Sequence, residues 1–174
     1  MNRRPVRRRT AVAVAVAVAV TGSFALGAGV AGAGTGSQAG KHTGPVTRAQ
    51  VLGLFDTWNA ALRTGDPREV ARLYAADAVL LPTVSDEVRT DRAGITDYFA
   101  HFLRNKPVGT KIDSYVDILD RNTVIDTGVY EFALTDPGTG AVRTVEARYT
   151  YVYEKQPGGT WLIVNHHSSR MPEG

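Results

Sequence analysis

Two adjacent histidines near the C-terminal end are the residues of this sequence best suited to chemistry. His166 and His167 lie in an apolar run that predicts a strand, where neighbouring side chains point to opposite faces. In a regular strand the two imidazoles cannot both chelate one metal ion, and only one of them faces the interior. We expect that one to be His167, which then shares a face with Trp161, Ile163 and Asn165.

The chemistry open to His167 depends on its surroundings. In a partly apolar pocket an imidazole can titrate near neutral pH and act as an acid/base catalyst. The alternative is a histidine that is hydrogen-bonded in the core or at a subunit interface.

The preceding predicted strand carries an arginine and three tyrosines on opposite faces. A half-buried Arg148 needs a carboxylate or a ligand oxyanion, so it is either an anion clamp or the partner of Glu146 or of another subunit. Tyr149, Tyr151 and Tyr153 share a face. They belong to the core or an interface, or they supply hydroxyl donors to a pocket.

Several classes of protein are excluded by what the sequence lacks. The absence of Cys rules out disulfides, thiolate metal sites and a cysteine nucleophile. There is no G-x-G-x-x-G dinucleotide motif, no haem or flavin motif, and no kinase H-R-D or D-F-G motif. We therefore expect neither a metal nor a cofactor.

The basic residues are concentrated at the N-terminus. The 20 Lys and Arg exceed the 17 Asp and Glu, which gives a net charge of +3, but five arginines precede residue 10. An apolar Ala/Val stretch and Ala31-Gly32-Ala33 follow, which together predict an export signal over 1–33 and a secreted domain. An uncleaved membrane anchor is the alternative, and general or twin-arginine export stays open. Without residues 1–33 the net charge is about −2, so the charge does not indicate nucleic-acid binding.

The rest of the chain is predicted to form one domain, which follows a flexible Gly/Ser/Thr-rich linker over 34–46. A capping box at Thr47 starts a helix that ends near Gly65, and Asp66-Pro67 starts a second helix. Apolar spacing predicts a third helix over 91–105.

Strands follow the helices. The short apolar run 78–81 predicts one strand, and alternation and turn residues predict four long antiparallel strands over 111–120, 122–134, 142–154 and 161–168. Ile112, Ser114, Val116 and Ile118 are expected on one face. Three amphipathic helices and one large sheet predict an α+β fold, in which a strongly curved antiparallel sheet wraps around the helices.

Residues 47–173 resemble the association domain of calcium/calmodulin-dependent protein kinase II and its small bacterial relatives, within the nuclear transport factor two-like and SnoaL-like cone folds. The likeness rests on Tyr98-Phe99, Leu103, Asn105-Lys106-Pro107, Gly140, Arg143-Thr144 and, most specifically, the run from Gly159 to Ser169.

This resemblance implies a cone-shaped curved sheet, as in a cystatin-like α+β barrel. It also implies a homodimer or larger ring formed through the outer sheet face, and a cone pocket for a small, often anionic, molecule. Arg143 matches one of the arginines that reach the pocket in the kinase domain, whereas Glu131 and Tyr151 stand at two other such positions. The residues expected around the pocket are Trp58, Tyr98, Arg143, Arg148, Tyr149, Tyr151 and Asn165.

Two functions remain open at this stage. The first is an exported, homo-oligomeric, non-catalytic module that binds a small organic molecule or mediates assembly. The second is an acid/base enzyme, such as a cyclase, dehydratase or isomerase or a relative labelled an oxidoreductase. It would act on a small hydrophobic or polyketide-like substrate through His167, with Tyr151 and Arg148 polarising a carbonyl.

Overall fold

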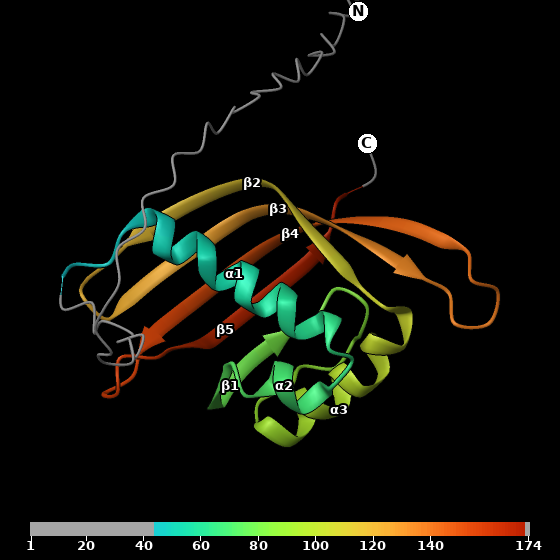
Figure 1. Cartoon of the computed structure of the whole chain (residues 1–174), viewed down its shortest axis with the longest axis horizontal. Helices are drawn as coiled ribbons and strands as arrows, with labels where there is room; N and C mark the ends of the chain where they lie inside the picture. The colour runs from blue at the N-terminus through green and yellow to red at the C-terminus, as the bar shows by residue number, and fades with distance from the viewer. Residues whose placement is uncertain (1–43, 173–174) are drawn as a thin grey trace, which may run out of the picture. The chain divides into compact units, whose positions relative to one another are not determined.

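One five-stranded sheet dominates the part of the chain that the structure describes, residues 44–172 (Figure 1). This structure is a computed structural model. The elements in chain order are α1 (Arg48–Arg63), α2 (Pro67–Ala71), β1 (Tyr74–Leu81), α3 (Arg92–Phe102), the 3₁₀ turn η1 (Leu103–Asn105), β2 (Val108–Ile118), β3 (Thr123–Thr135), β4 (Val142–Lys155) and β5 (Trp161–Arg170). The predicted signal peptide and all but the last three residues of the linker lie outside the described residues.

The helices begin where the sequence predicts. At the start of α1 the Gln50 amide donates to Thr47 Oγ1 at 3.3 Å, and the Thr47 amide donates to Gln50 Oε1 at 2.8 Å, which confirms the capping box. Asp66 caps α2 by accepting the Arg68 amide at 2.8 Å. The predicted third helix is α3 followed by η1, because its last turn tightens into a 3₁₀ turn.

The strands run in the order β1-β5-β4-β3-β2. Strands β2 to β5 form the expected antiparallel meander. The short first strand differs from the prediction in two ways. It begins at Tyr74, four residues before the predicted start at residue 78, and it pairs in parallel with β5, so the sheet is mixed. The long stretch of chain between β1 and β5, which contains α3 and β2 to β4, provides the connection that a parallel pair requires.

A β-bulge in β5 changes which residues of that strand face inward. Val152 pairs with Asn165, but the next residue of β4, Tyr153, pairs with Ile163, so Val164 is one extra residue in β5. Ile163 is buried before the bulge, and the buried positions after it are His166 and Ser168. The extra residue therefore reverses the alternation of inner and outer faces along the strand.

A second bulge lies in β2 at Ile112, between the Lys111 and Asp113 pairings with β3. It leaves Ile112 51% exposed, so the prediction that Ile112 shares a face with Ser114 and Val116 is wrong. Lys111 points inward instead and contacts the buried Asp126.

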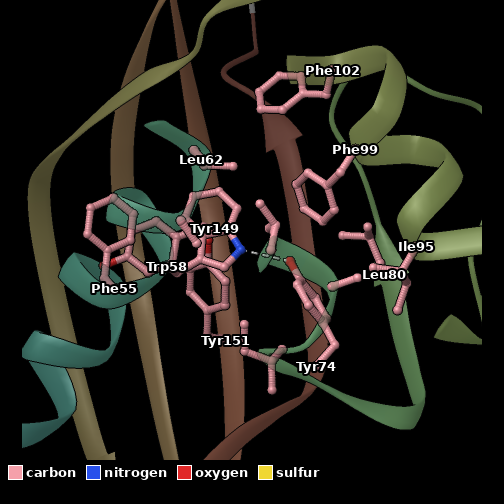
Figure 2. Packing of buried hydrophobic residues seen from close by; sticks show 14 of the residues in the cluster. Phe55, Trp58, Leu62, Tyr74, Leu80, Ile95, Phe99, Phe102, Tyr149 and Tyr151 are labelled. Carbon is pink, nitrogen blue, oxygen red and sulfur yellow. Dashed lines mark hydrogen bonds between the residues drawn. The ribbon is translucent and has the colours of Figure 1, made fainter. Parts of the chain in front are cut away.

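The core lies between the sheet and the helices, and aromatic rings fill much of it (Figure 2). Phe55 and Trp58 of α1 pack against Tyr149 and Tyr151 of β4, with ring centroids 5.7–6.5 Å apart. The tyrosine stripe predicted on β4 therefore faces the core. Among residues 44–172 no helix is long and apolar enough to cross a membrane.

A glycine makes the β2 bulge possible, and this can be tested. A Cβ at Gly128 would lie 2.1 Å from the backbone oxygen of Asp113, which cannot move without disrupting the β2–β3 pairing. We expect Gly128→Ala to lower the free energy of unfolding by at least the upper end of the about 1–3 kcal/mol typical of overpacking. Denaturant melts measure this.

Gly53 provides the matched control, because a Cβ there meets no atom within 4 Å and the residue lies in α1. Gly53→Ala should raise the free energy of unfolding by about 1 kcal/mol, as expected for glycine inside a helix. Equal effects of the two substitutions would contradict the close approach at Gly128.

Candidate functional site

A buried chain of three hydrogen-bonding side chains links α1, β1 and β5. Trp58 Nε1 donates to the Tyr74 hydroxyl at 3.1 Å, and this hydroxyl lies 2.9 Å from Nδ1 of His166. Figure 2 shows the Trp58 and Tyr74 side chains converging from their two elements. The imidazole also stacks on Tyr151, with ring centroids 4.0 Å apart, so it is held in orientation as well as in place.

The other imidazole nitrogen of His166 has no partner. Its Nε2 is buried and forms no hydrogen bond with any atom of residues 44–172. Burial lowers the pKa of His166 to about 3, and the neighbouring His167 adds to the decrease. The ring is therefore neutral at physiological pH and has one polar atom free.

A cavity of about 30 Å³ adjoins His166, which is room for about two water molecules. Its wall is mostly aromatic and aliphatic and includes no Asp, Glu, Lys or Arg. The lining residues are Trp58, Leu80, Pro82, Thr83, Val84, Tyr98, Phe99, Phe102, Tyr130, Phe132, Leu134, Val145, Ala147, His166 and Ser168.

Three hydroxyl groups close one side of this cavity. Tyr130 donates to Ser168 Oγ at 2.5 Å, and Ser168 is hydrogen-bonded in turn to Thr83. Thr83 follows β1 in the chain, so this bond fastens the loop after β1 to the inner face of β5.

A wider groove of about 400 Å³ lies beside the cavity. Val84, Tyr98 and Phe102 line both spaces. The groove also has basic residues that the cavity lacks, among them Arg89 and Arg143. Arg89 is already paired with Glu87 and lies 3.9 Å from Asp97.

A second polar cluster is buried under α1. The carboxylate of Asp126, which is fully buried, pairs with Lys111 and accepts hydrogen bonds from Ser114 at 2.5 Å and Tyr149 at 3.0 Å. The ammonium group of Lys111 lies 4.9 Å from the centroid of the Phe55 ring. The carboxylate and the ammonium group each have partners. The cluster therefore joins β2, β3 and β4 and leaves no unpaired ion in the apolar core.

Proteins of known family and structure are similar to this chain. The family profile of the calcium/calmodulin dependent protein kinase II association domain matches residues 47–172. A structure from Xanthomonas campestris, described as a domain of this kind, is 55% identical, with a TM-score of 0.72 over 74% of this chain and 91% of that one.

The chain belongs to the calcium/calmodulin-dependent protein kinase II association domain family.

More distant structures share only the fold with this association domain. The association domain of C. elegans CaMKII is 18% identical, with a TM-score of 0.59 over 70% of this chain and 94% of that one. An NTF2-like protein with a cystatin-like fold from Novosphingobium aromaticivorans is 13% identical, with a TM-score of 0.60 over 73% and 83%. No curated protein matches the chain.

The prediction that His167 faces the interior of this association domain is wrong. His167 is exposed on the outer sheet face, where it pairs with Thr150, and His166 takes the inner position. The cause is the bulge at Val164, which shifts the alternation by one residue. Asn165 also falls on the outer side for this reason, and it does not line the cavity.

The prediction that Arg148 lies around the pocket is also wrong. It is exposed on the outer face of β4, opposite Val129 and Ser169, and does not reach the cavity. It forms no ion pair with Glu146 within the described part of the chain. The expected convergence of His167, Arg148 and Tyr151 on one point therefore does not occur, because only Tyr151 lies inside.

The other predicted pocket residues lie on the inner side of the sheet or at its rim. Trp58 and Tyr98 line the cavity, and Tyr151 supports His166 from behind. Tyr149 belongs to the Asp126 cluster instead. Arg143 is exposed and lines only the outer groove.

Sequence reasoning missed both polar clusters of the association domain, but one of them had a signal. Asp126 lies on the same face of β3 as the buried residues Val124, Tyr130 and Phe132. The alternation of the strand could therefore have predicted an acidic residue on the core face. Tyr74 and Ser168 carried no such signal, because their partners come from distant parts of the chain.

The site is better suited to binding than to proton transfer. A histidine with its pKa near 3 is a poor general base at neutral pH, and no carboxylate lines the cavity. Nor do residues 44–172 contain a group of three His, Asp or Glu side chains placed to hold a metal ion. What remains is a small cavity with mostly apolar walls, lined also by His166 and by the three linked hydroxyl residues Thr83, Tyr130 and Ser168.

The low pKa of His166 makes stability depend on pH. Between pH 6.5 and about 3 the unfolded chain binds a proton at this residue and the folded chain does not. The free energy of unfolding should therefore fall as the pH drops below 6.5, by up to about 1.4 kcal/mol per pH unit from this residue. Denaturant melts from pH 7 to pH 4 measure this slope.

The comparison of two variants isolates His166 from the carboxylates that titrate in the same range. His166→Leu should have a shallower pH dependence than the wild type, whereas His167→Leu should keep the steeper one because His166 remains. Identical slopes for the wild type and His166→Leu would show that the imidazole is not kept neutral by burial.

Proposed function

We propose that this association domain is a self-associating, non-catalytic module that binds a small organic molecule in the cavity beside His166. One observation carries the proposal: a cavity with mostly apolar walls and no charged lining residue lies among Trp58, Tyr98 and the buried His166. Pockets for small organic molecules have mostly apolar walls with a few polar groups, and this cavity has that composition.

The surroundings of the cavity support binding without catalysis. The histidine is held by Tyr74 and Tyr151, and the cavity wall has no charged group that could serve as its catalytic partner. We also propose that the domain is exported, on the basis of the basic, apolar and small-residue pattern over residues 1–33.

Xenon tests the cavity directly, because a single apolar atom suits a space with room for about two water molecules and needs no polar partner. Addition of xenon to the purified protein should shift the NMR signals of cavity residues such as Leu80 and Val145. Ala147→Val places a larger side chain in the wall and should weaken xenon binding at least about tenfold.

Ala133→Val is the matched control, since Ala133 lies on the neighbouring strand with its side chain directed away from the cavity. It should bind xenon like the wild type. A wild-type protein in which xenon shifts no cavity signal would overturn the binding function.

Self-association is proposed through the outer face of the sheet. Along the edge strand β2 this face has three exposed apolar side chains: Val108 (43% exposed), Ile112 (51%) and Tyr115 (66%). The family is one of association domains, and apolar patches of this kind on a sheet indicate a contact surface.

Sedimentation equilibrium tests the assembly. We expect a dimer or larger species for the wild type and at least an about tenfold weaker association for Tyr115→Glu, because a charge would be buried in the contact. The control Val88→Glu changes an equally apolar exposed residue in the loop before α3 and should leave assembly intact. A wild-type monomer at all concentrations would refute this proposal.

A further inference from the structure

Three charged residues at the centre of the outer sheet face have no partners in their own chain. β4 is the middle strand of the five, and Glu146 and Arg148 are exposed on its outer side. Glu146 lies directly opposite Glu131 of β3, which places two like charges side by side. None of the three forms an ion pair within residues 44–172. An opposite charge from another molecule would therefore stabilise this part of the face.

Opposite charges two residues apart on one strand are complementary to a second copy of that strand. Consider a two-fold axis that lies between two outer faces and crosses β4 at Ala147. It makes the two copies of β4 antiparallel and exchanges positions 146 and 148. Arg148 of each copy then faces Glu146 of the partner subunit, and this pair occurs twice. Ala147 itself points into the core and is only 1% exposed, so its side chain does not separate the two faces.

Strand pairing fixes where the same axis crosses the rest of the sheet. Ala147 pairs with Tyr130 of β3, and Tyr130 pairs with Lys111 of β2. Ile112, the bulge residue of β2, comes directly after Lys111 and is 51% exposed. The axis therefore brings Ile112 of each copy next to Ile112 of the partner subunit.

The other two exposed apolar residues of β2 named above lie symmetrically about this row. Val108 pairs with Ala133, which is three residues to one side of Tyr130. Tyr115 pairs with Thr127, which is three residues to the other side. The axis thus exchanges Val108 and Tyr115, so each tyrosine meets the valine of the partner subunit. The charges on β4 and the apolar residues on β2 are separate observations, and both fit one axis.

We propose that two copies of this domain pack outer face to outer face about this axis, with Arg148 of each copy paired with Glu146 of the partner subunit. The proposal rests on the self-association proposed above and adds the geometry of the contact and the residues that select the partner. The ion pairs set the register of the two sheets, because any other register would bring like charges together or leave them unpaired.

Charge reversal tests the ion pair. Two glutamates would meet across the axis in Arg148→Glu, and two arginines would meet in Glu146→Arg. Sedimentation equilibrium should show at least an about tenfold weaker association for each variant than for the wild type, since juxtaposed like charges are unfavourable. The control Arg104→Glu makes the same change of net charge at an exposed position in η1 and should associate like the wild type.

A mixture of the two variants identifies the partner of Arg148. Equal amounts of Arg148→Glu and Glu146→Arg restore both opposite-charge pairs between the two chains, as does the double variant in a single chain. Both samples should associate at least about tenfold more tightly than either single variant alone. Mixing cannot restore an ion pair within one chain, so rescue by the mixture requires contact between copies.

An engineered cysteine tests the position of the axis. The chain has no Cys, so a single introduced thiol can form a disulfide only with a second copy. Ile112→Cys should form a disulfide-linked dimer in oxidised glutathione, because its two copies meet at the axis. The control Ile118→Cys changes an exposed residue of the same strand that lies far from the axis, and it should stay unlinked.

The outcomes separate this contact from self-association in general. If the wild type associates but charge reversal has no effect, or the mixture associates as weakly as the single variants, the ion pair is wrong and self-association stands. Linking of Ile118→Cys as fast as Ile112→Cys would overturn the axis. If the wild type is monomeric at all concentrations, both proposals fail.

Discussion

One extra residue in β5 determines which side chains of that strand face the core. The bulge at Val164 allows Ile163 to enter the core beside Tyr153 and still brings His166 and Ser168 to the inner face. In a strand of regular alternation the residues inside would be His167 and Ser169, and the contacts with Tyr74 and Tyr130 would require a different backbone. The bulge thus aligns the polar residues of β5 with partners on β1, β3 and α1.

The two polar clusters of the core differ in how completely their polar atoms are paired. At Asp126 a full negative charge is compensated by Lys111 and by two hydroxyl donors, so nothing at this point is left for a ligand. At His166 the group is neutral and only one of its two nitrogens is engaged. A satisfied ion pair specifies how strands pack, whereas the neutral ring of His166 keeps one nitrogen without a partner among residues 44–172.

Much of this architecture could be predicted from the sequence, because it depends on local signals. Thr47 with Gln50, and Asp66 with Pro67, mark helix starts by capping chemistry, and the four long strands follow from alternation. The family likeness is confirmed over nearly the same residues.

The errors fall where long-range geometry overrides the local pattern. A bulge has no reliable sequence signature, so the choice between His166 and His167 could not be made from alternation alone. The parallel pairing of β1 with β5 joins segments far apart in the chain and is not visible in either of them. Arg148 was assigned to the pocket for the same reason, since an exposed arginine between apolar residues resembles a buried one.

The residues that follow the bulge come in doublets: His166-His167 and then Ser168-Ser169. If β5 slipped by one residue, His167 would replace His166 on the inner face and Ser169 would replace Ser168, so an imidazole and a hydroxyl would still meet Tyr74 and Tyr130. A slip in this direction would therefore exchange the residues inside without changing their chemistry, whereas a slip in the opposite direction would bring Asn165 and His167 inside. The doubled sequence thus makes the inner face of this strand tolerant of a register error in one direction.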